Sequence, residues 1–313
     1  MKILVATDGA RTSGAAVRFA AALAAKLRGG SLTVITVGRL PSRRWLARPR
    51  SGQLESPIEE RERVWSQRVL ERARRDAERL GARVRTAYAG ANKLEPIAQT
   101  IARTGSRERA DLVVVGSGGA KEFLRYTLGS ITHRLVHVSR LPVAVVRAGA
   151  ATGRGPVRIL AATDGSKPSR AAVAFAARLA SAIPRARLVV LCVSTLAADI
   201  ALTGAAFVRA LGVLPDLDRA ERAAADRTLR EAAKLTRGLG KRVEFVYRRP
   251  GRPTPAARAI VREAAHRAST LIVLGNAGRS AVNDLVLGSV AQRVLDLSRR
   301  PVVLVRASSK GAR

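Results

Sequence analysis

The sequence is poor in aromatic residues, cysteine and long apolar runs. Aromatic residues make up 3% of its 313 residues while hydrophobic residues make up 47%, so the core must consist of Val, Leu, Ile and Ala, as in a parallel sheet covered by alanine-rich helices. The single cysteine, Cys192, excludes a disulfide framework and a cysteine-based metal site, and its neighbours in LVVLCV predict a buried side chain. No apolar run approaches the roughly 18–20 residues that cross a bilayer, and residues 1–10 lack the layout of a signal peptide. We therefore expect a cytoplasmic protein with no membrane partner.

Acidic residues are also scarce. The chain has 23 Asp and Glu against 57 Lys and Arg, a formal net charge of +34, which would attract any polyanion non-specifically. Most of these cations are arginine, and they are spread along both halves of the chain. Neither interleaved aromatic residues nor a known nucleic-acid motif accompanies them. The charge therefore indicates a compositional bias more than a designed groove, and a polyanion-binding role is kept as an alternative function.

The chain repeats itself, which decides how every later pattern is interpreted. The segment ILVATDG at residues 3–9 recurs as ILAATDG at residues 159–165, an offset of 156, whereas Gly81 recurs as Gly240, an offset of 159. The second copy therefore has three extra residues between Val193 and Gly240. Residues 148–156 are small, glycine-rich and aperiodic, as in a linker. We predict a first domain at 1–147, a linker at 148–156 and a second domain at 157–313.

Short β-branched runs alternate with longer helical patterns in each copy. In the first copy we predict strands at 2–7, 32–37, 83–88, 111–116 and 143–147, and helices at 12–27, 57–80, 94–109 and 130–139. The second copy repeats the pattern. Strict alternation predicts parallel strands joined by right-handed crossovers, that is, two tandem doubly wound, Rossmann-like α/β domains with five-stranded parallel sheets. Ligands of such sheets bind just beyond the carboxyl ends of the strands.

The first strand of each copy ends in Thr-Asp-Gly. These residues are Thr7, Asp8 and Gly9 in the first copy, and Thr163, Asp164 and Gly165 in the second. An Asp at this place can accept hydrogen bonds from the hydroxyl groups of a ribose or from a base amine. A purely structural role, as turn former and helix cap, also accounts for it, and both interpretations stay open.

The fourth strand of each copy runs into a glycine pattern with a fixed spacing. GxxG is followed by nine residues and then Gly-Ser, and the positions are Gly116, Gly119, Gly129 and Ser130 in the first copy and Gly275, Gly278, Gly288 and Ser289 in the second. Glycines let backbone N–H groups approach a ligand, and the Gly-Ser pair opens a helix whose free amides favour an anion. Neither a Walker A loop nor the dinucleotide fingerprint has this layout. The pattern therefore predicts a phosphate cradle in each copy.

The combined pattern resembles the ATP-binding class of universal stress protein domains, and the resemblance covers nearly the whole chain. It implies an adenine nucleotide alpha hydrolase-like fold with strand order 3-2-1-4-5 in each copy. It also implies that Asp8 and Asp164, beside Thr7 and Thr163, contact adenosine, and that the backbone of Val37 and Val193 contacts adenine. The remaining implied ligand residues shape the loop or hold phosphates: Gly116, Gly119, Gly129, Ser130 and Ile131, and Gly275, Gly278, Gly288, Ser289 and Val290.

The resemblance implies a nucleotide-binding sensor or regulatory protein of the stress response rather than an enzyme. We expect ATP or another adenine nucleotide in both domains, with Mg²⁺ as a candidate companion ion and no metal site of the protein's own. A slow ATPase or nucleotide-dependent enzyme is the main alternative, although the motif region has no His, Glu or Asp in register in both copies to act as a base. The resemblance further implies pairing of the two domains through their last strands, and a homodimer of chains is a further expectation.

Overall fold

The computed structural model describes residues 1–38, 57–91, 96–118, 129–150, 155–194, 214–249, 255–278 and 287–307. The chain divides into two compact units, Met1–Arg154 and Gly155–Arg313. Gly119 of the predicted site and the arginine-rich segment around Trp45 lie outside the described residues.

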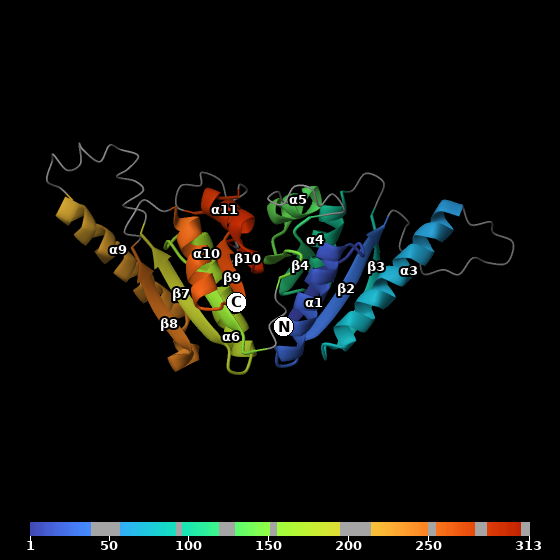
Figure 1. The fold of residues 1–313 in the computed structure, drawn as a ribbon, viewed down its shortest axis with the longest axis horizontal. Coiled ribbons are helices and arrows are strands. Elements are labelled where there is room, and N and C mark those ends of the chain that lie inside the picture. Colours follow the sequence, from blue (N-terminus) through green and yellow to red (C-terminus); the bar gives the residue numbers. More distant parts are fainter. Residues whose placement is uncertain are drawn as a thin grey trace. The chain divides into compact units, whose positions relative to one another are not determined.

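The first unit is a parallel sheet with the strand order β3-β2-β1-β4-β5 (Figure 1). Its strands are β1 (Lys2–Ala6), β2 (Ser31–Gly38), β3 (Val84–Gly90), β4 (Leu112–Gly116) and β5 (Val143–Val146). Its helices are α1 (Arg11–Lys26), α3 (Pro57–Glu78), α4 (Ile97–Arg107) and α5 (Ser130–Val138). The order reverses between β1 and β4, which is where a doubly wound sheet opens a crevice for ligands.

The second unit repeats this topology with the order β8-β7-β6-β9-β10. Its strands are β6 (Arg158–Ala162), β7 (Arg187–Val193), β8 (Val243–Arg248), β9 (Leu271–Gly275) and β10 (Val302–Val305). Its helices are α6 (Lys167–Ala182), α9 (Leu214–Leu235), α10 (Ala256–His266) and α11 (Ser289–Leu297), with a short 3-10 helix at Arg237–Arg242. The predicted fold class is therefore confirmed for both copies.

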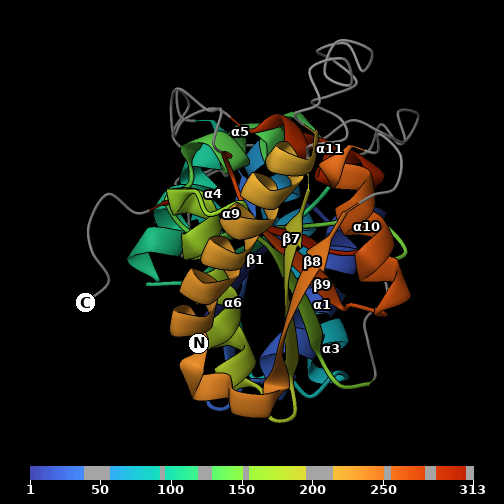
Figure 2. The same ribbon diagram turned by 90° about the vertical axis from the view of Figure 1, so that its left-hand side faces the viewer.

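Helices cover both faces of each sheet. In the second unit, α6 and α9 pack together on one side of the strands and α10 and α11 on the other (Figure 2). The central strands are buried on both faces, which explains their continuous Val, Leu, Ile and Ala composition. One of the few aromatic side chains, Phe175 of α6, lies fully inside this core.

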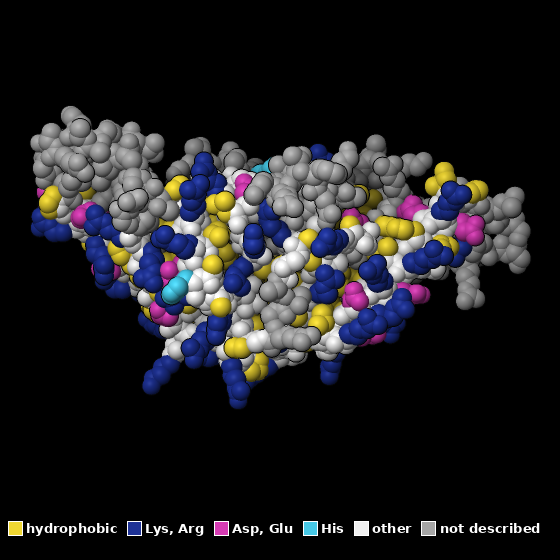
Figure 3. All heavy atoms as spheres, in the orientation of Figure 1, with side chains coloured by type: hydrophobic (Ala, Val, Ile, Leu, Met, Phe, Trp, Pro, Cys, Tyr) yellow, Lys and Arg dark blue, Asp and Glu magenta, His cyan; other side chains and the backbone are white. Residues whose placement is uncertain are grey.

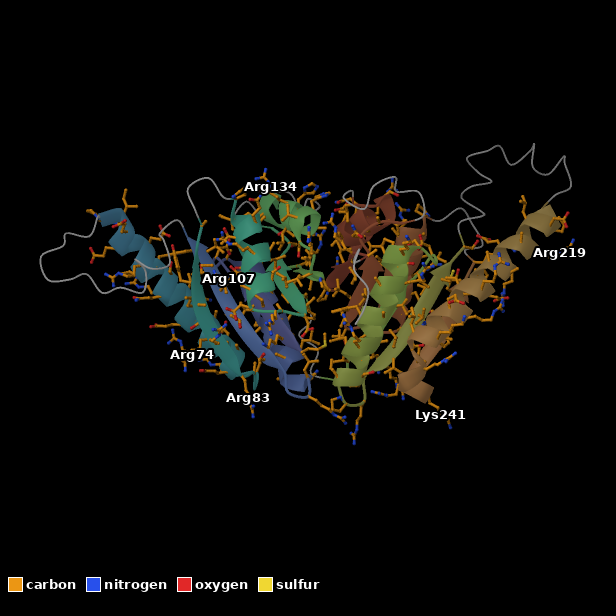
Figure 4. The ribbon with its side chains drawn as sticks, turned by 180° about the vertical axis from the view of Figure 1, so that it is seen from behind. Arg74, Arg83, Arg107, Arg134, Arg219 and Lys241 are labelled. Carbon is orange, nitrogen blue, oxygen red and sulfur yellow. The ribbon has the colours of Figure 1, made fainter. Side chains whose placement is uncertain are left out.

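Charged side chains lie on the outside of these layers. Lys and Arg side chains are scattered over the visible face (Figure 3), and labelled ones such as Arg74, Arg107 and Arg219 project from different elements (Figure 4). On α3, Arg74 donates to Glu78 four residues later at 2.7 Å, as the alternating charges of this helix predict. Among the described residues, no helix combines the length and apolar character needed to cross a membrane.

Candidate functional site

A cavity of about 670 Å³ opens at the carboxyl ends of the strands of the second domain. All eight residues predicted for the second-copy site line it: Thr163, Asp164, Val193, Gly275, Gly278, Gly288, Ser289 and Val290. They come from the ends of β6, β7 and β9 and from the start of α11, segments that are distant in the sequence. The volume falls within the range of small-molecule and cofactor sites.

The Thr-Asp-Gly turn is held by a similar hydrogen-bond network in both domains. In the second, the Thr163 hydroxyl lies 3.1 Å from that of Ser169, and Asp164 Oδ1 accepts from the Ser166 N–H at 3.0 Å. In the first, Asp8 Oδ1 accepts from the Ala10 N–H at 3.0 Å and from the Ser13 hydroxyl at 2.5 Å. Each Asp therefore forms a turn over the residue that begins the following helix.

Neither Asp is itself the helix cap, which refines the structural interpretation considered above. Helix α6 has Ser166 as its N-cap, and the Ser166 hydroxyl accepts from the Ser169 N–H at 3.4 Å. Helix α1 has Ala10 in the same position, with no side-chain cap. The Asp carboxylates use one oxygen, Oδ1, to close the turn, while Oδ2 of Asp164 points to Gly278, where a Cβ would stand only 3.2 Å away. A glycine at 278 thus keeps the space in front of this carboxylate open.

The backbone of Val193 and that of Val37 each face the turn that follows the first strand of their domain. The Thr163 N–H donates to the Leu191 carbonyl at 2.9 Å, the last contact between β6 and β7 at this edge, and Thr7 does the same with Ile35. Alternate residues of a strand direct their amide groups toward the same neighbouring strand. Val193 lies two residues beyond Leu191, so its N–H and C=O face the turn that follows β6. They offer one donor and one acceptor at the cavity wall.

The first glycine of each GxxG pattern has a packing role. A Cβ on Gly275 would stand 2.7 Å from the backbone of Pro168 and Ser169, and one on Gly116 would stand 2.8 Å from the backbone of Thr12 and Ser13. Carbon atoms ordinarily approach to about 3.5–4.0 Å. Glycine is therefore needed at these positions for the close approach of strand and helix, whether or not a ligand is bound.

The Gly-Ser pair begins a helix with free amides, as its sequence predicts. Helix α11 starts at Ser289 after Gly288, and no side chain caps it. The first backbone bond within the helix runs from the Gln292 N–H to the Gly288 carbonyl at 2.9 Å, which leaves the amides of residues 289–291 without a partner in the helix. Helix α5 starts in the same way at Ser130, with Ile131 following it. The positive end of the α11 dipole therefore borders the cavity.

Sequence reasoning missed the wall that α9 and β8 provide. Glu221, Ala225 and Thr228 of α9 and Tyr247 of β8 line the cavity beside Cys192. A signal for this wall exists in the sequence, because Glu221 and Tyr247 repeat Glu62 and Tyr88 at the offset of 159. It is weak, since single Glu and Tyr residues in a charged helix and an outer strand have many structural roles.

Electrostatics on this wall favour a neutral phenol beside a carboxylate. Burial raises the pKa of Tyr247, and the nearby carboxylate of Glu221 raises it further, although a hydrogen bond with Ser194 acts in the opposite direction. The hydroxyl of Tyr247 therefore keeps its proton at neutral pH and acts as a donor. It donates to Glu221 Oε2 at 3.4 Å.

One difference between the copies lies away from the cavity. Asp111 precedes β4, where its Oδ2 accepts from the Lys2 N–H at 2.8 Å, and Thr270 accepts from the Arg158 N–H at 3.1 Å in the second copy. These residues tie the amino ends of neighbouring strands together, at the opposite edge from the site. The exchange of Asp for Thr therefore concerns sheet packing.

The two repeated doubly wound α/β domains, the second with a glycine-bordered cavity, define a tandem Rossmann-like fold. The model of the universal stress protein family matches residues 1–147 and 157–306, and the chain belongs to this family. A universal stress protein of Mycobacterium tuberculosis is 31% identical over 201 residues, which are 64% of this chain and 63% of that protein. The chain thus spans less than two thirds of the length of that relative.

Solved structures share the fold over almost the whole chain. A universal stress protein from Archaeoglobus fulgidus aligns with a TM-score of 0.61 at 20% identity, covering 98% of both chains. A functionally unknown protein from Pseudomonas aeruginosa aligns with a TM-score of 0.63 at 17% identity, covering 98% of this chain and 92% of that one. At these identities the likeness establishes the tandem fold.

Proposed function

We propose that each domain binds one adenine nucleotide, with ATP as the expected ligand, and that occupancy makes the chain a sensor or regulator in a stress response. The single observation that carries this proposal is the cavity of about 670 Å³ whose lining includes every residue predicted for the second site. The family membership of both halves extends the proposal to the first domain. Its equivalent residues are Thr7, Asp8, Val37, Gly116, Gly129, Ser130 and Ile131, together with Gly119, which lies outside the described residues.

The residues around the cavity suit the parts of such a nucleotide. The Val193 backbone offers a donor and an acceptor, which match N1 and the 6-amino group of adenine. Asp164 accepts hydrogen bonds and so suits a ribose hydroxyl. The uncapped start of α11 suits a phosphate, because its free amides and dipole favour an anion. Mg²⁺ would bind mainly through the phosphates.

Regulation requires that the nucleotide stabilise one conformation more than another. The start of α11 and the turn after β6 are the segments that would respond to the nucleotide, because both border the cavity. The start of α11 has free backbone amides, and the turn after β6 is held by a short network of side-chain hydrogen bonds. Pairing of the two domains and of two chains remains part of the proposal, as does a cytoplasmic location.

The proposal is tested by the nucleotide that the protein carries. The full chain is purified gently and denatured, and the released nucleotide is identified and counted by chromatography. We expect adenine nucleotide near two per chain, directly or after incubation with ATP and Mg²⁺. If no nucleotide remains bound after ATP is added, the proposal is wrong.

A substitution assigns the site. Gly278→Val would fill the space before the Asp164 carboxylate, where even a Cβ would stand at 3.2 Å, and should halve the bound nucleotide. Adding Gly119→Val, at the equivalent position of the first copy, should remove the remaining bound nucleotide. Gly238→Val is the matched control, since a Cβ there meets nothing within 4 Å. Undiminished binding in the double variant would contradict the site assignment.

A further inference from the structure

A carboxylate stands at the end of β7, in the cavity wall of the second domain. Glu221 Oε2 accepts from the Ser194 hydroxyl at 2.6 Å and from Tyr247 at 3.4 Å, and all three residues line the cavity. The guanidinium carbon of Arg222 lies 5.0 Å from the centre of the Tyr247 ring. This cation holds the ring in place while Glu221, the preceding residue on α9, turns toward the strand end.

The first domain repeats the arrangement with different packing. Tyr88 donates to Glu62 Oε1 at 2.7 Å, and Gly38 takes the position of Ser194. A Cβ on Gly38 would overlap the Glu62 carboxylate and stand 2.5 Å from the Tyr88 hydroxyl. The carboxylate of Glu62 thus fills the space that the Ser194 side chain takes in the second domain. Both copies therefore bring a Glu–Tyr pair against the residue that follows Val37 or Val193.

For a base that binds to the Val193 backbone, this placement would put the carboxylate on the side of the base amino group. The peptide bond joins the Val193 carbonyl to Ser194, so a base amino group that donates to this carbonyl lies on the Ser194 side of Val193. The Ser194 hydroxyl in turn donates a hydrogen bond to Glu221. An ionised carboxylate only accepts hydrogen bonds, and it has about four acceptor positions. It attracts an N–H group at this place and repels a carbonyl oxygen.

We propose that Glu221 and Glu62 determine the base specificity of the two sites by accepting a hydrogen bond from the 6-amino group of adenine and rejecting purines with a 6-oxo group. This inference rests on the proposed function, because it assumes an adenine nucleotide in the crevice. Tyr247 and Tyr88 are positioning residues, since each donates to its carboxylate and holds it at the strand end.

The test compares ATP with ITP, which differs at the 6-position of the base by an oxo group in place of the amine. Binding of each to the full chain is measured by titration calorimetry or equilibrium dialysis, for the wild type and for the double variant Glu62→Gln with Glu221→Gln. Glutamine both donates and accepts, so its amide can turn to suit either base. Glu231→Gln with Glu78→Gln is the matched control, because these residues lie on α9 and α3 in exposed ion pairs.

We expect the wild type to prefer ATP by roughly 5- to 150-fold, the discrimination typical of a well-placed hydrogen-bonding pair at a base edge. In the Glu62→Gln, Glu221→Gln variant the ratio should fall several-fold, to the preference that the Val193 and Val37 backbone sets by itself, mainly through tighter binding of ITP, while the control keeps the wild-type ratio. If the two glutamates had a purely structural role, the variant would bind both nucleotides more weakly by the same factor, and the ratio of the ATP and ITP affinities would stay unchanged.

The outcomes separate this inference from the proposed function. Wild-type protein that binds ATP and ITP equally well overturns the inference, and this arm needs no variant to fold. ATP binding with a ratio unchanged in the double variant also overturns it, while the proposed function stands. If the wild type binds neither nucleotide, the proposed function fails and the inference fails with it.

Discussion

Replacing Gly116 by alanine should destabilise the first domain, because β4 and α1 approach each other too closely there for a side chain. The added Cβ would stand 2.8 Å from Thr12 C and Ser13 N, and 3.0 Å from Thr12 O. Since carbon contacts normally lie at about 3.5–4.0 Å, α1 would have to move by roughly 0.7–1.2 Å. The colliding atoms are backbone atoms of a helix, so no side-chain rotation can relieve the overlap.

Overpacking of this kind costs about 1–3 kcal/mol. For a domain of this size, each kcal/mol lowers the Tm by roughly 2–4 °C, so we expect a Tm lower by roughly 2–12 °C. Tryptophan fluorescence during thermal unfolding reports on the first domain alone, because both tryptophans of the chain, Trp45 and Trp65, belong to it. Calorimetry of the equivalent Gly275→Ala variant should show the same loss in the second domain.

Gly118→Ala is the matched control. It lies two residues further along the same segment, a Cβ there meets nothing within 4 Å, and the second copy already has alanine at the equivalent position, Ala277. Its Tm should stay within about 2 °C of the wild type, because an uncrowded surface substitution changes stability by at most about 0.5 kcal/mol. A Gly116→Ala variant as stable as Gly118→Ala would refute the argument that packing requires glycine at this position.

Two further predictions concern the second domain. Burial alone would raise the pKa of Glu263, but hydrogen bonds from Arg248 and Arg267 outweigh it and lower the pKa. The stability that these hydrogen bonds contribute is therefore present above the ordinary pKa of 4.5, and it is lost as the pH falls through the lower pKa of the folded state. Glu263→Gln should therefore cost about 1–3 kcal/mol in urea unfolding at pH 7 and make stability less dependent on pH below 4.5. Glu231→Gln is an exposed control on α9: Lys234 lowers the pKa of Glu231 too, but solvent screens this ion pair, so the variant should change both quantities much less. Parallel acid profiles of the wild type and Glu263→Gln would contradict the account. Cys192, the single cysteine, is buried and lines the cavity, so saturating ATP should slow its alkylation by a maleimide, measured by mass spectrometry. An alkylation rate that ATP leaves unchanged, in protein shown to bind ATP, would place the nucleotide elsewhere.

Most of the fold could be predicted from the sequence because two of its signals are local and repeated. Alternation of β-branched and helical runs placed the strand at 112–116 and the helix at 130–138 to within a residue of their observed bounds. Repetition at a fixed offset supported each assignment twice. The strand order came from the family resemblance, since alternation alone does not specify the order in which parallel strands lie.

The candidate site could be predicted where a short motif encodes it. The glycines and Gly-Ser pairs stand at the ends of strands and the beginnings of helices, and backbone geometry requires those residue types there. The motif did not reveal that Gly116 and Gly275 are also needed for packing, because the helix that approaches each of them is more than 100 residues away in the chain. Sequence spacing carries no information about such an approach.

The sequence by itself determined the duplication, the α/β class and the position of the glycine-rich crevice, because each follows from residue types at regular local spacing. Only the tertiary structure decided which side chains complete the crevice. Glu221 and Tyr247 meet Ser194 at the end of β7, although Ser194 precedes them by 27 and 53 residues. The crossover of α9 over the sheet brings them together, and a contact made by a crossover depends on how helix and strand pack rather than on any pattern along the chain.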